Sequence, residues 1–178
     1  RFRSVAGGSG GAARRRDGEQ DLLRRREADG FQVGTPRAGG NDALIDGIIG
    51  ARDFRTGTWQ GYFDSDVIAS VDLGSEKPIN SVVVNFLKDQ RSWIFYPTEV
   101  ECLASKDGVN FISVGNFKFP EITPSEDVEI QNVAFKQTLA SYRYVKIIAK
   151  KLGVLPEWHL GYEHDGRSWL FVDEITIK

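Results

Sequence analysis

Short apolar runs separated by turn residues, from about residue 65 onward, most constrain the fold of this chain. Val67–Gly74, Ile79–Leu87 and Glu99–Ser105 are rich in β-branched residues or alternate apolar with polar positions, as half-buried strands do. Similar runs cover residues 128–135, 142–148 and 171–177. No convincing amphipathic helical pattern lies between them. The spacing predicts an all-β fold, an antiparallel β-sandwich (jelly roll) of about eight strands.

The composition fits one domain without a strongly charged partner. With 178 residues the chain can bury a substantial core, and its formal net charge of −2 gives no reason to expect nucleic acid as a partner. No apolar run is long enough to cross a bilayer, so we expect no membrane insertion, and we expect a monomer. The single cysteine, Cys102, shares one strand face with Val100 and Ala104 and is predicted to be a small buried hydrophobe.

Residues 1–30 differ in kind from the rest. They hold eight arginines against five acids and a flexible Gly7–Gly11 segment. One interpretation is a basic arm for nucleic acid or a membrane, and the other is a linker or disordered tail. The interleaved acids favour the second interpretation. We therefore predict an atypical N-terminal extension over 1–30 and one module over 31–178.

The tryptophans gather in or beside the long connections 40–66, 88–97 and 150–169 rather than within periodic strands. Long loops on a rigid β-scaffold commonly carry function. An indole face stacks on the C–H face of a sugar, while nearby polar groups bond its hydroxyls. The predicted carbohydrate contacts are Trp59, Gln60, Tyr62, Gln90, Arg91, Trp93, Trp158, His159, Asp165 and Trp169. The alternative is that some of these aromatics cap the core, above all Trp169, which abuts the strand at Leu170–Val172.

Several segments, taken in their order and spacing, resemble the discoidin domain. This domain is also called the coagulation factor 5/8 type C domain, and it overlaps with carbohydrate-binding module family 32. The segments are Trp59 followed by Ile68–Gly74, then Pro97–Glu101, Ser105–Phe111, Tyr142–Ile147 and Asp173–Ile175. The resemblance covers the chain from about residue 39 and implies an eight-stranded jelly roll that contacts ligand through loops at one end.

A narrower resemblance is to the domains appended to bacterial β-hexosaminidases (chitobiases). It rests on Gln90–Phe95, Trp158-His159 and Ser168–Glu174. The chain departs from the family in residues 1–30, which have no counterpart, and in the stretch from Asp46 to Trp59, which is several residues longer than usual.

Ala43–Gly47 resembles the Asp-Gly calcium loop of the family, and Glu174 matches its second acidic ligand. Calcium takes about six to eight oxygen ligands from carboxylates and from the carbonyls of a turning loop. The metal ligands that the resemblance implies are Leu44, Asp46, Thr56, Thr58 and Glu174, around a structural calcium ion. The alternative is that Asp46 only caps its own turn and Glu174 is a solvated strand residue.

These observations predict a non-catalytic carbohydrate-binding module. The resemblance suggests a terminal module of a secreted, periplasmic or surface-bound bacterial glycoside hydrolase such as a β-hexosaminidase, with a glycan as partner. Terminal galactose and N-acetylhexosamine residues are the expected ligands. A protein- or cell-surface adhesion module of the discoidin type is the alternative, although animal versions usually carry disulfides, which one cysteine cannot form.

Catalysis and a transition-metal site are weaker alternatives. A glycosidase needs two carboxylates that flank a cleft, whereas Glu157, Glu163 and Asp165 lie in one loop. His159 and His164 with Glu163 and Asp165 match no strong zinc spacing.

Overall fold

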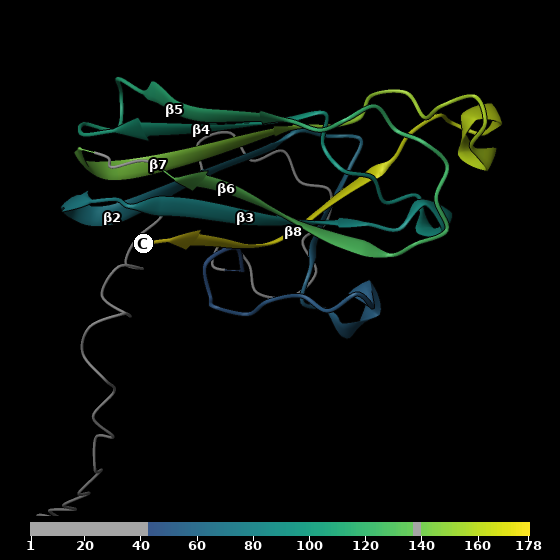
Figure 1. The fold of residues 1–178 in the computed structure, drawn as a ribbon, viewed down its shortest axis with the longest axis horizontal. Helices are drawn as coiled ribbons and strands as arrows, with labels where there is room; N and C mark the ends of the chain where they lie inside the picture. Colours follow the sequence, from purple (N-terminus) through teal and green to yellow (C-terminus); the bar gives the residue numbers. More distant parts are fainter. Residues whose placement is uncertain (1–42, 137–139) are drawn as a thin grey trace, which may run out of the picture.

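The computed structural model describes residues 43–136 and 140–178, and these form a sandwich of two four-stranded sheets packed face to face (Figure 1). All strand pairs within the sheets are antiparallel. One sheet has the order β1-β8-β3-β6 and the other β2-β7-β4-β5. The prediction of an eight-stranded antiparallel β-sandwich is confirmed.

Six of the eight strands agree closely with the apolar runs of the sequence, and β1 and β5 lie outside those runs. Their bounds are β1 Gln60–Phe63, β2 Val67–Pro78, β3 Ser81–Lys88, β4 Glu99–Ser105, β5 Ile112–Lys118, β6 Glu129–Lys136, β7 Ser141–Lys150 and β8 Trp169–Ile177. Three short 3-10 turns complete the secondary structure of the described residues: η3 Phe54–Thr56, η4 Gln90–Ser92 and η5 Leu160–Glu163. Within those residues no helix has the length and hydropathy that crossing a membrane requires.

The core lies between the sheets and follows the two-residue period of the strands. In β4, Val100, Cys102 and Ala104 point inward and are at most 1% exposed, while the alternate residues Glu99, Glu101 and Leu103 are partly exposed. Burial and the adjacent Glu101 carboxylate raise the pKa of the Cys102 thiol to about 12. Because only the thiolate is a strong nucleophile, the predicted structural role of Cys102 is confirmed.

The segment after Trp59 is a strand rather than the expected turn. Gln60–Phe63 pairs with β8 over four residues as β1, with alternating burial. Gly61 makes this pairing possible, because a Cβ there would lie 2.6 Å from Cε1 of Phe171. Sequence periodicity misses β1 because a four-residue strand with a central glycine gives too short a pattern.

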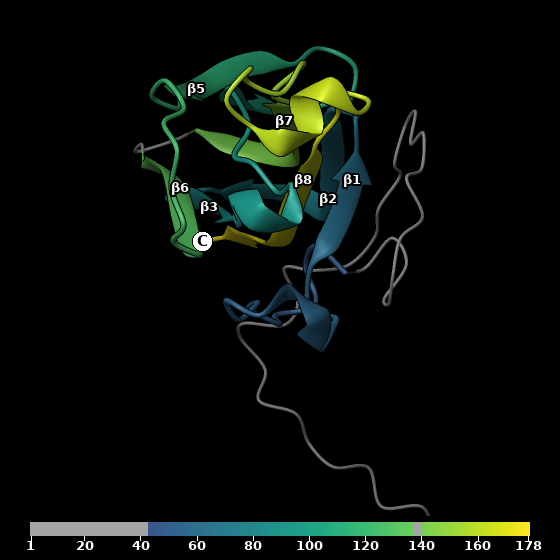
Figure 2. The ribbon, with the colours of Figure 1, turned by 90° about the vertical axis from the view of Figure 1, so that its right-hand side faces the viewer.

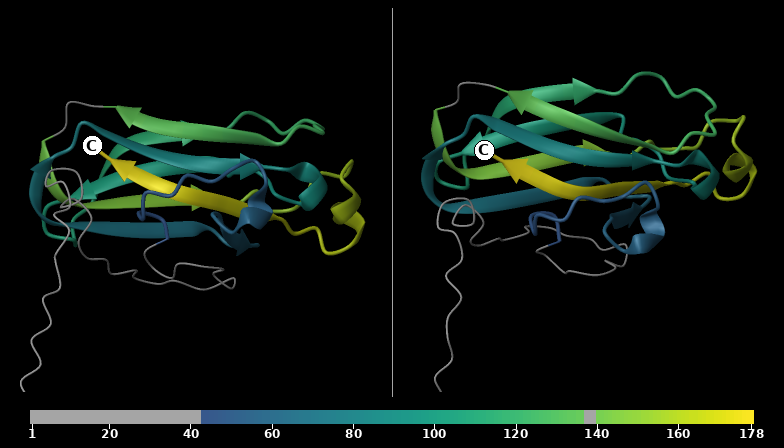
Figure 3. Two further views of the ribbon diagram at one scale, coloured as in Figure 1. Left: turned by 90° about the horizontal axis from the view of Figure 1, so that it is seen from below. Right: turned by 60° about the horizontal axis from the view of Figure 1, so that its bottom comes forward.

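Residues 43–58 run along the outside of the sandwich beside β8, as Figure 3 shows. The Ile175 amide donates to the Leu44 carbonyl at 2.7 Å. The Gly47 amide donates to the Glu174 carboxylate at 3.1 Å, and the Gly50 amide donates to the Asp173 carboxylate at 2.6 Å. Three successive residues of β8 therefore hold this long connection in place.

The 3-10 turns η4 and η5 lie at one end of the sandwich, away from the C-terminus, and Figure 2 looks onto this end. The connection from β5 to β6 and the start of β8 reach the same end. The sandwich thus gathers loops from distant parts of the sequence, as expected for a site built on loops. Residues 1–42, which include the predicted extension 1–30, lie outside the described residues.

Replacement of Phe86 by alanine should destabilise the sandwich strongly. Phe86 in β3 has 0% exposure, and truncation of a buried phenylalanine costs about 3–5 kcal/mol through lost burial and the cavity left behind. Urea denaturation followed by circular dichroism measures the change in the free energy of unfolding. Val109→Ala, at a position that is 80% exposed, serves as the control and should change it by about 0.5 kcal/mol or less. Equal effects of the two substitutions would contradict the assigned core.

Candidate functional site

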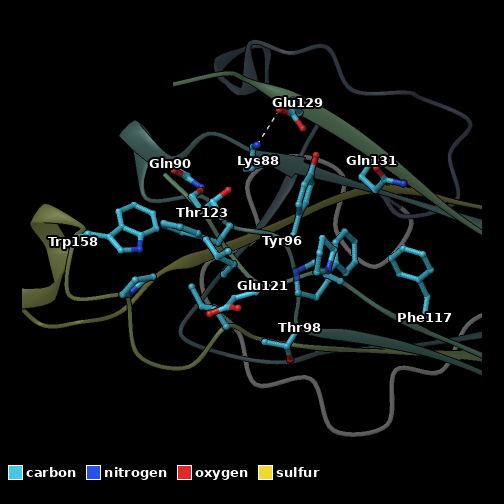
Figure 4. Close-up of a pocket in the computed structure, with 17 residues that line it drawn as sticks. Lys88, Gln90, Tyr96, Thr98, Phe117, Glu121, Thr123, Glu129, Gln131 and Trp158 are labelled. Atoms are coloured by element: carbon cyan, nitrogen blue, oxygen red, sulfur yellow. Dashed lines mark hydrogen bonds and ion pairs between the residues drawn. The ribbon is translucent and has the colours of Figure 1, made fainter. Parts of the chain in front are cut away.

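A cavity of about 620 Å³ opens between the edge strands β5 and β6, at the end of the sandwich that carries η4 and η5. We call it the end cavity, and Figure 4 shows the side chains that line it. It receives residues from the end of β3, from the segment after η4, from β5 and the loop that follows it, and from the loop before η5. Its volume lies within the range of about 300–1,000 Å³ typical of ligand pockets.

One wall of the end cavity is aromatic. The rings of Tyr96 and Phe119 stack with centroids 4.9 Å apart and an interplanar angle of 27°. Phe117 meets Phe119 edge to face at 5.0 Å, and Phe119 in turn meets the buried Phe86 at 5.9 Å. The wall is thus anchored on the core of the sandwich, and ring pairs of this kind add about 0.5–1.5 kcal/mol beyond burial.

Trp158 lines the end cavity from the loop before η5 and is 44% exposed. Its indole meets the imidazole of His159 edge to face, with centroids 5.9 Å apart. It is the most exposed of the four tryptophans in this chain. Trp158 therefore keeps an aromatic surface in contact with solvent at the cavity, as predicted for a stacking residue.

His159 joins the two loops that carry η4 and η5. Its Nδ1 accepts a hydrogen bond from the Gly161 amide at 3.1 Å, so its Nε2 carries the proton and donates to the Gln90 carbonyl at 2.9 Å. Phe95 packs edge to face on the ring at 5.2 Å. Because both ring nitrogens have protein partners, His159 positions loops, and the prediction that it contacts ligand does not fit this geometry.

Gln90 connects a third loop to the other two. Its side chain is 4% exposed, donates to the Thr123 carbonyl at 2.9 Å and accepts from the Ser125 amide at 2.7 Å. Its own carbonyl holds His159. The predicted Gln90 thus lines the cavity, but the polar atoms of its amide bond the loop between β5 and β6 and fix the shape of the cavity.

Two of the charged side chains that line the end cavity, Lys88 and Glu129, form an ion pair with each other, and the third, Glu121, does not belong to it. The Lys88 ammonium lies 2.9 Å from a carboxylate oxygen of Glu129 and donates to the Ser125 hydroxyl at 3.3 Å. Glu121 also lines the cavity, and no ion pair to it occurs within residues 43–136 and 140–178. Burial raises the pKa of the Tyr96 phenol far above its ordinary value, and its hydroxyl has no hydrogen-bond partner among the described residues. The exposed Glu121 carboxylate is therefore the acidic group of the cavity that remains free to bond a ligand in the described part of the chain, whereas the Tyr96 hydroxyl is enclosed.

A second hollowed region lies on the other side of η4, and we call it the side groove. It consists of two adjoining hollows of about 550 and 360 Å³ that share Phe54, Arg55 and Ser92. The predicted residues Arg91, Trp59 and Trp169 border this groove and not the end cavity. The structure therefore divides the predicted aromatic set between two places.

Trp59 and Trp169 serve mainly in packing. Trp59 is 3% exposed, and its Nε1 donates to the Ala51 carbonyl at 2.7 Å. Trp169 is partly buried between Phe63, at 5.0 Å between ring centroids, and Phe171 at 5.9 Å. The burial of Trp59 contradicts its prediction as a stacking face, and the alternative that Trp169 caps the core agrees with its packing.

The prediction that Gln60 and Tyr62 contact a carbohydrate is also corrected by the structure. Both are 5% exposed because they take the inward positions of β1. Burial raises the pKa of Tyr62 to about 12. Both side chains are therefore almost fully enclosed in the sandwich.

The remaining predicted contacts are Trp93, Arg91 and Asp165. Trp93 packs against the segment around η5, whereas Arg91 and Asp165 are exposed. Trp93 stacks on His164 at 5.9 Å and has a left-handed backbone with φ of 63°, a conformation that costs energy in residues other than glycine. Arg91 forms a surface ion pair with Glu126 at 3.7 Å. The Arg167 amide donates to the Asp165 carboxylate and lowers its pKa. None of these three lines the end cavity.

The predicted calcium ligands come together only in part. The Glu174 carboxylate is 5% exposed and faces the turn that contains Asp46 and Gly47, and the Leu44 carbonyl lies against β8 as well. Asp46 is exposed and accepts from the Ile48 amide at 2.8 Å, as in the capping alternative. This buried carboxylate beside a turning loop fits the oxygen chemistry of calcium. The expectation that Glu174 is a solvated residue is wrong, because β8 is covered by residues 43–50.

The two threonines of the predicted set bond elsewhere. The Thr56 hydroxyl donates to the Asp53 carbonyl at 2.9 Å and lies 3.2 Å from the Thr58 hydroxyl. Among the described residues no group of three or more His, Cys, Asp or Glu side chains is placed to hold a metal ion. Glu174 and the 44–47 turn therefore lie together, Thr56 and Thr58 bond elsewhere, and the calcium site stays a prediction.

Sequence reasoning missed most of the residues that line the end cavity. The labelled ones in Figure 4 that it missed are Lys88, Tyr96, Thr98, Phe117, Glu121, Thr123, Glu129 and Gln131. The sequence signal for these residues was the pair Phe117 and Phe119 followed by Pro120, because this pattern places two aromatic rings at the end of a strand. That these rings and Trp158 line the same cavity follows only from the pairing of β4 with both β5 and β7.

Comparison with known proteins gives one family. A family model described as the F5/8 type C domain matches residues 32–175. No curated protein matches the chain.

Solved structures with a similar fold include modules of bacterial glycoside hydrolases. The CBM32-1 module of a family 31 glycoside hydrolase from Clostridium perfringens is 16% identical with a TM-score of 0.51, over 89% of this chain and 97% of that one. The C-terminal domain of a chitobiase from Bacteroides fragilis is 16% identical with a TM-score of 0.44, over 77% of this chain and 78% of that one. At these identities the likeness concerns the fold alone.

Replacement of Gln90 by alanine should loosen the loop between β5 and β6. The substitution leaves the Thr123 carbonyl and the Ser125 amide without their side-chain partner, and each hydrogen bond lost contributes about 0.5–1.5 kcal/mol. Amide hydrogen exchange at Ser125 should accelerate, and the melting temperature should fall. Arg91→Ala, at the exposed neighbour, is the matched control and should leave both measurements near their original values. Unchanged exchange at Ser125 in Gln90→Ala would contradict the role assigned to this side chain.

Proposed function

The chain belongs to the F5/8 type C domain family, and from this premise we propose that it is a non-catalytic carbohydrate-binding module whose ligand occupies the end cavity. The observation that carries the proposal is the exposed indole of Trp158 at a cavity that also presents polar side chains. A sugar needs both kinds of surface, since one face of its ring is apolar and its edge carries hydroxyls.

The polar groups of the cavity are suited to sugar hydroxyls. Glu121 supplies carboxylate oxygens, Gln131 an amide and Thr98 a hydroxyl, and all three residues are exposed. Trp158 and the Phe117–Phe119 segment supply aromatic surface. A ligand held by a few polar contacts over a largely aromatic wall is the usual arrangement of a small-molecule site.

The same groups argue against hydrolysis. Glycoside cleavage requires one carboxyl group as acid and another as base or nucleophile. In the end cavity the Glu129 carboxylate is paired with Lys88, which leaves Glu121 as the one uncommitted carboxylate that lines it in the described part of the chain. Such a site binds a glycan without an evident partner for general acid and base work.

The expected biological setting follows from the family. We propose that the module accompanies a bacterial glycan-degrading enzyme such as a β-hexosaminidase, that it acts outside the cytoplasm or on the cell surface, and that it recognises galactose or hexosamine units. An adhesion module is the second possibility. The exposed Val154 and Leu160 beside Trp158 favour it, because apolar side chains at loop tips can dock on a protein surface.

Replacement of Trp158 by alanine should abolish glycan binding and leave the fold intact. The wild-type module is first tested on a glycan array, and its best ligand is then titrated into both proteins by calorimetry. Loss of a stacking indole should weaken binding at least tenfold, while the melting temperature changes by no more than about 2–4 °C because the side chain is exposed.

Leu160→Ala is the matched control, since Leu160 is 84% exposed in the same loop and does not line the cavity. It should retain wild-type affinity. A large fall in melting temperature for Trp158→Ala would make Trp158 a core residue, and turnover of chromogenic N-acetylhexosaminides or galactosides by the purified module would overturn the non-catalytic proposal.

We also propose that a calcium ion stabilises the connection between residues 43 and 50 and β8. Glu174 would hold it together with the turn at Asp46, and the ion would supply positive charge next to a carboxylate that is otherwise costly to bury. Its role would be structural, because these residues do not line the end cavity.

Chelation should therefore lower the melting temperature, while the sugar affinity should change little. An ion present at a hundred times its dissociation constant stabilises the native state by about 2.7 kcal/mol. Glu174→Gln keeps an acceptor for the Gly47 amide but removes the charge, so it should melt at a lower temperature than wild type in calcium, and the two should converge in excess chelator. If chelator leaves the wild-type melting curve unchanged and elemental analysis finds no metal, Asp46 is a turn residue and the calcium proposal fails.

A further inference from the structure

The end cavity has an uncompensated negative charge, and this charge bears on the class of sugar it accepts. We propose that its ligand is an amino sugar with a free, protonated amine, such as a β-linked glucosamine unit, in preference to N-acetylated or acidic sugars. This inference rests on the proposed function. It concerns the charge of the ligand, which neither the fold nor the aromatic surface decides.

The only cation among the residues that line the cavity is already committed. The Lys88 side chain is 14% exposed, pairs with Glu129 at 2.9 Å and donates to the Ser125 hydroxyl. Its ammonium also lies 5.9 Å from the centre of the Tyr96 ring. With its charge balanced by Glu129 and its donors engaged, Lys88 gives little attraction to an anionic ligand.

Glu121 is the group without a counter-charge. It is exposed, it lines the cavity, and no lysine, arginine or histidine pairs with it in residues 43–136 and 140–178. Figure 4 shows its carboxylate among the lining side chains, in the view between those of Trp158 and Thr98. A ligand ammonium here would form the ion pair that the protein does not supply, and such charge-assisted hydrogen bonds are about twice as strong as neutral ones.

The exposed indole of Trp158 favours the same charge. A cation that approaches the face of an indole is attracted by the negative electron density of the ring. Trp158 lines the cavity and is exposed, whereas the Tyr96 ring already stacks on Phe119 and lies near the Lys88 ammonium. A sugar that stacks on Trp158 and carries an ammonium thus gains from both the ring and Glu121.

The surroundings extend the negative field beyond the cavity. The loop between β5 and β6 also carries Glu126 and Asp127, and the loop before η5 carries Glu157, all exposed. Of these, Glu126 is balanced by Arg91 at 3.7 Å. The field of the remaining acids attracts a cationic polysaccharide and repels uronic acids and sulfated sugars. N-acetylation removes the charge that Glu121 would recognise, so the acetylated sugar should bind more weakly.

Calorimetric titration with three tetrasaccharides tests the proposal. The probes are the glucosamine tetramer, its fully N-acetylated form and a tetragalacturonate, at pH 6 and low salt. We expect wild-type protein to bind the free-amine tetramer about five- to tenfold more tightly than the acetylated one, and to show no measurable binding of the uronate. Added salt should reduce this preference, because it screens exposed charges.

The variant Glu121→Gln isolates the charge at constant shape. It should weaken binding of the free-amine tetramer about five- to tenfold and change the affinity for the acetylated tetramer less than twofold. The control is Glu126→Gln, in the same loop but outside the cavity, and it should retain the wild-type preference.

The outcomes separate this inference from the proposed function. Equal affinity of the wild-type protein for the two glucosamine tetramers, or an equal loss for both in Glu121→Gln, overturns the amine preference and leaves sugar binding intact. Failure to bind any of the three tetrasaccharides, together with an empty glycan array, overturns the proposed function itself.

Discussion

The amide of Gln90 is the contact on which the end of this sandwich depends. Its side chain bonds Thr123 and Ser125 in one loop, and its carbonyl holds His159 in another. A buried side-chain amide can satisfy all of its polar groups only if every partner is in place. The loops after β3, β5 and β7 are therefore coupled through a single residue, although they lie far apart in the sequence. The end cavity takes its shape from this coupling rather than from the sheets alone.

The fold could be predicted almost completely from the sequence, because the period of two is a local property of each strand. The segment Glu99–Ser105 was recognised with the bounds that the structure has, and the burial of Cys102 follows from the same alternation. The exceptions are β5, where Gly115 and Asn116 interrupt the apolar pattern, and β1, where Gly61 does so between Gln60 and Tyr62. The existence of β1 depends on the space beneath Phe171, which is a tertiary property.

The site was far less predictable, because the role of an aromatic residue depends on what covers it. Trp59 and Trp158 both stand in loop-like sequence, yet the segment at Gly50 helps to bury the first, while the second stays 44% exposed. Conversely, Phe117 and Tyr96 look like ordinary members of a strand and its flank. They reach the cavity because it opens between the edge strands β5 and β6. Burial decides between core and ligand surface, and single-sequence patterns do not contain it.

The unequal exposure of the four tryptophans gives this protein an internal optical reporter. Trp59 is enclosed, Trp93 and Trp169 are partly covered, and Trp158 alone is in the exposed class. Indole emission shifts to longer wavelength in water, so the red edge of the fluorescence spectrum arises mainly from Trp158. A soluble quencher such as iodide reaches this indole first. Any molecule that settles over the end cavity would shield it, and the occupancy of the cavity can thus be followed in solution without a label.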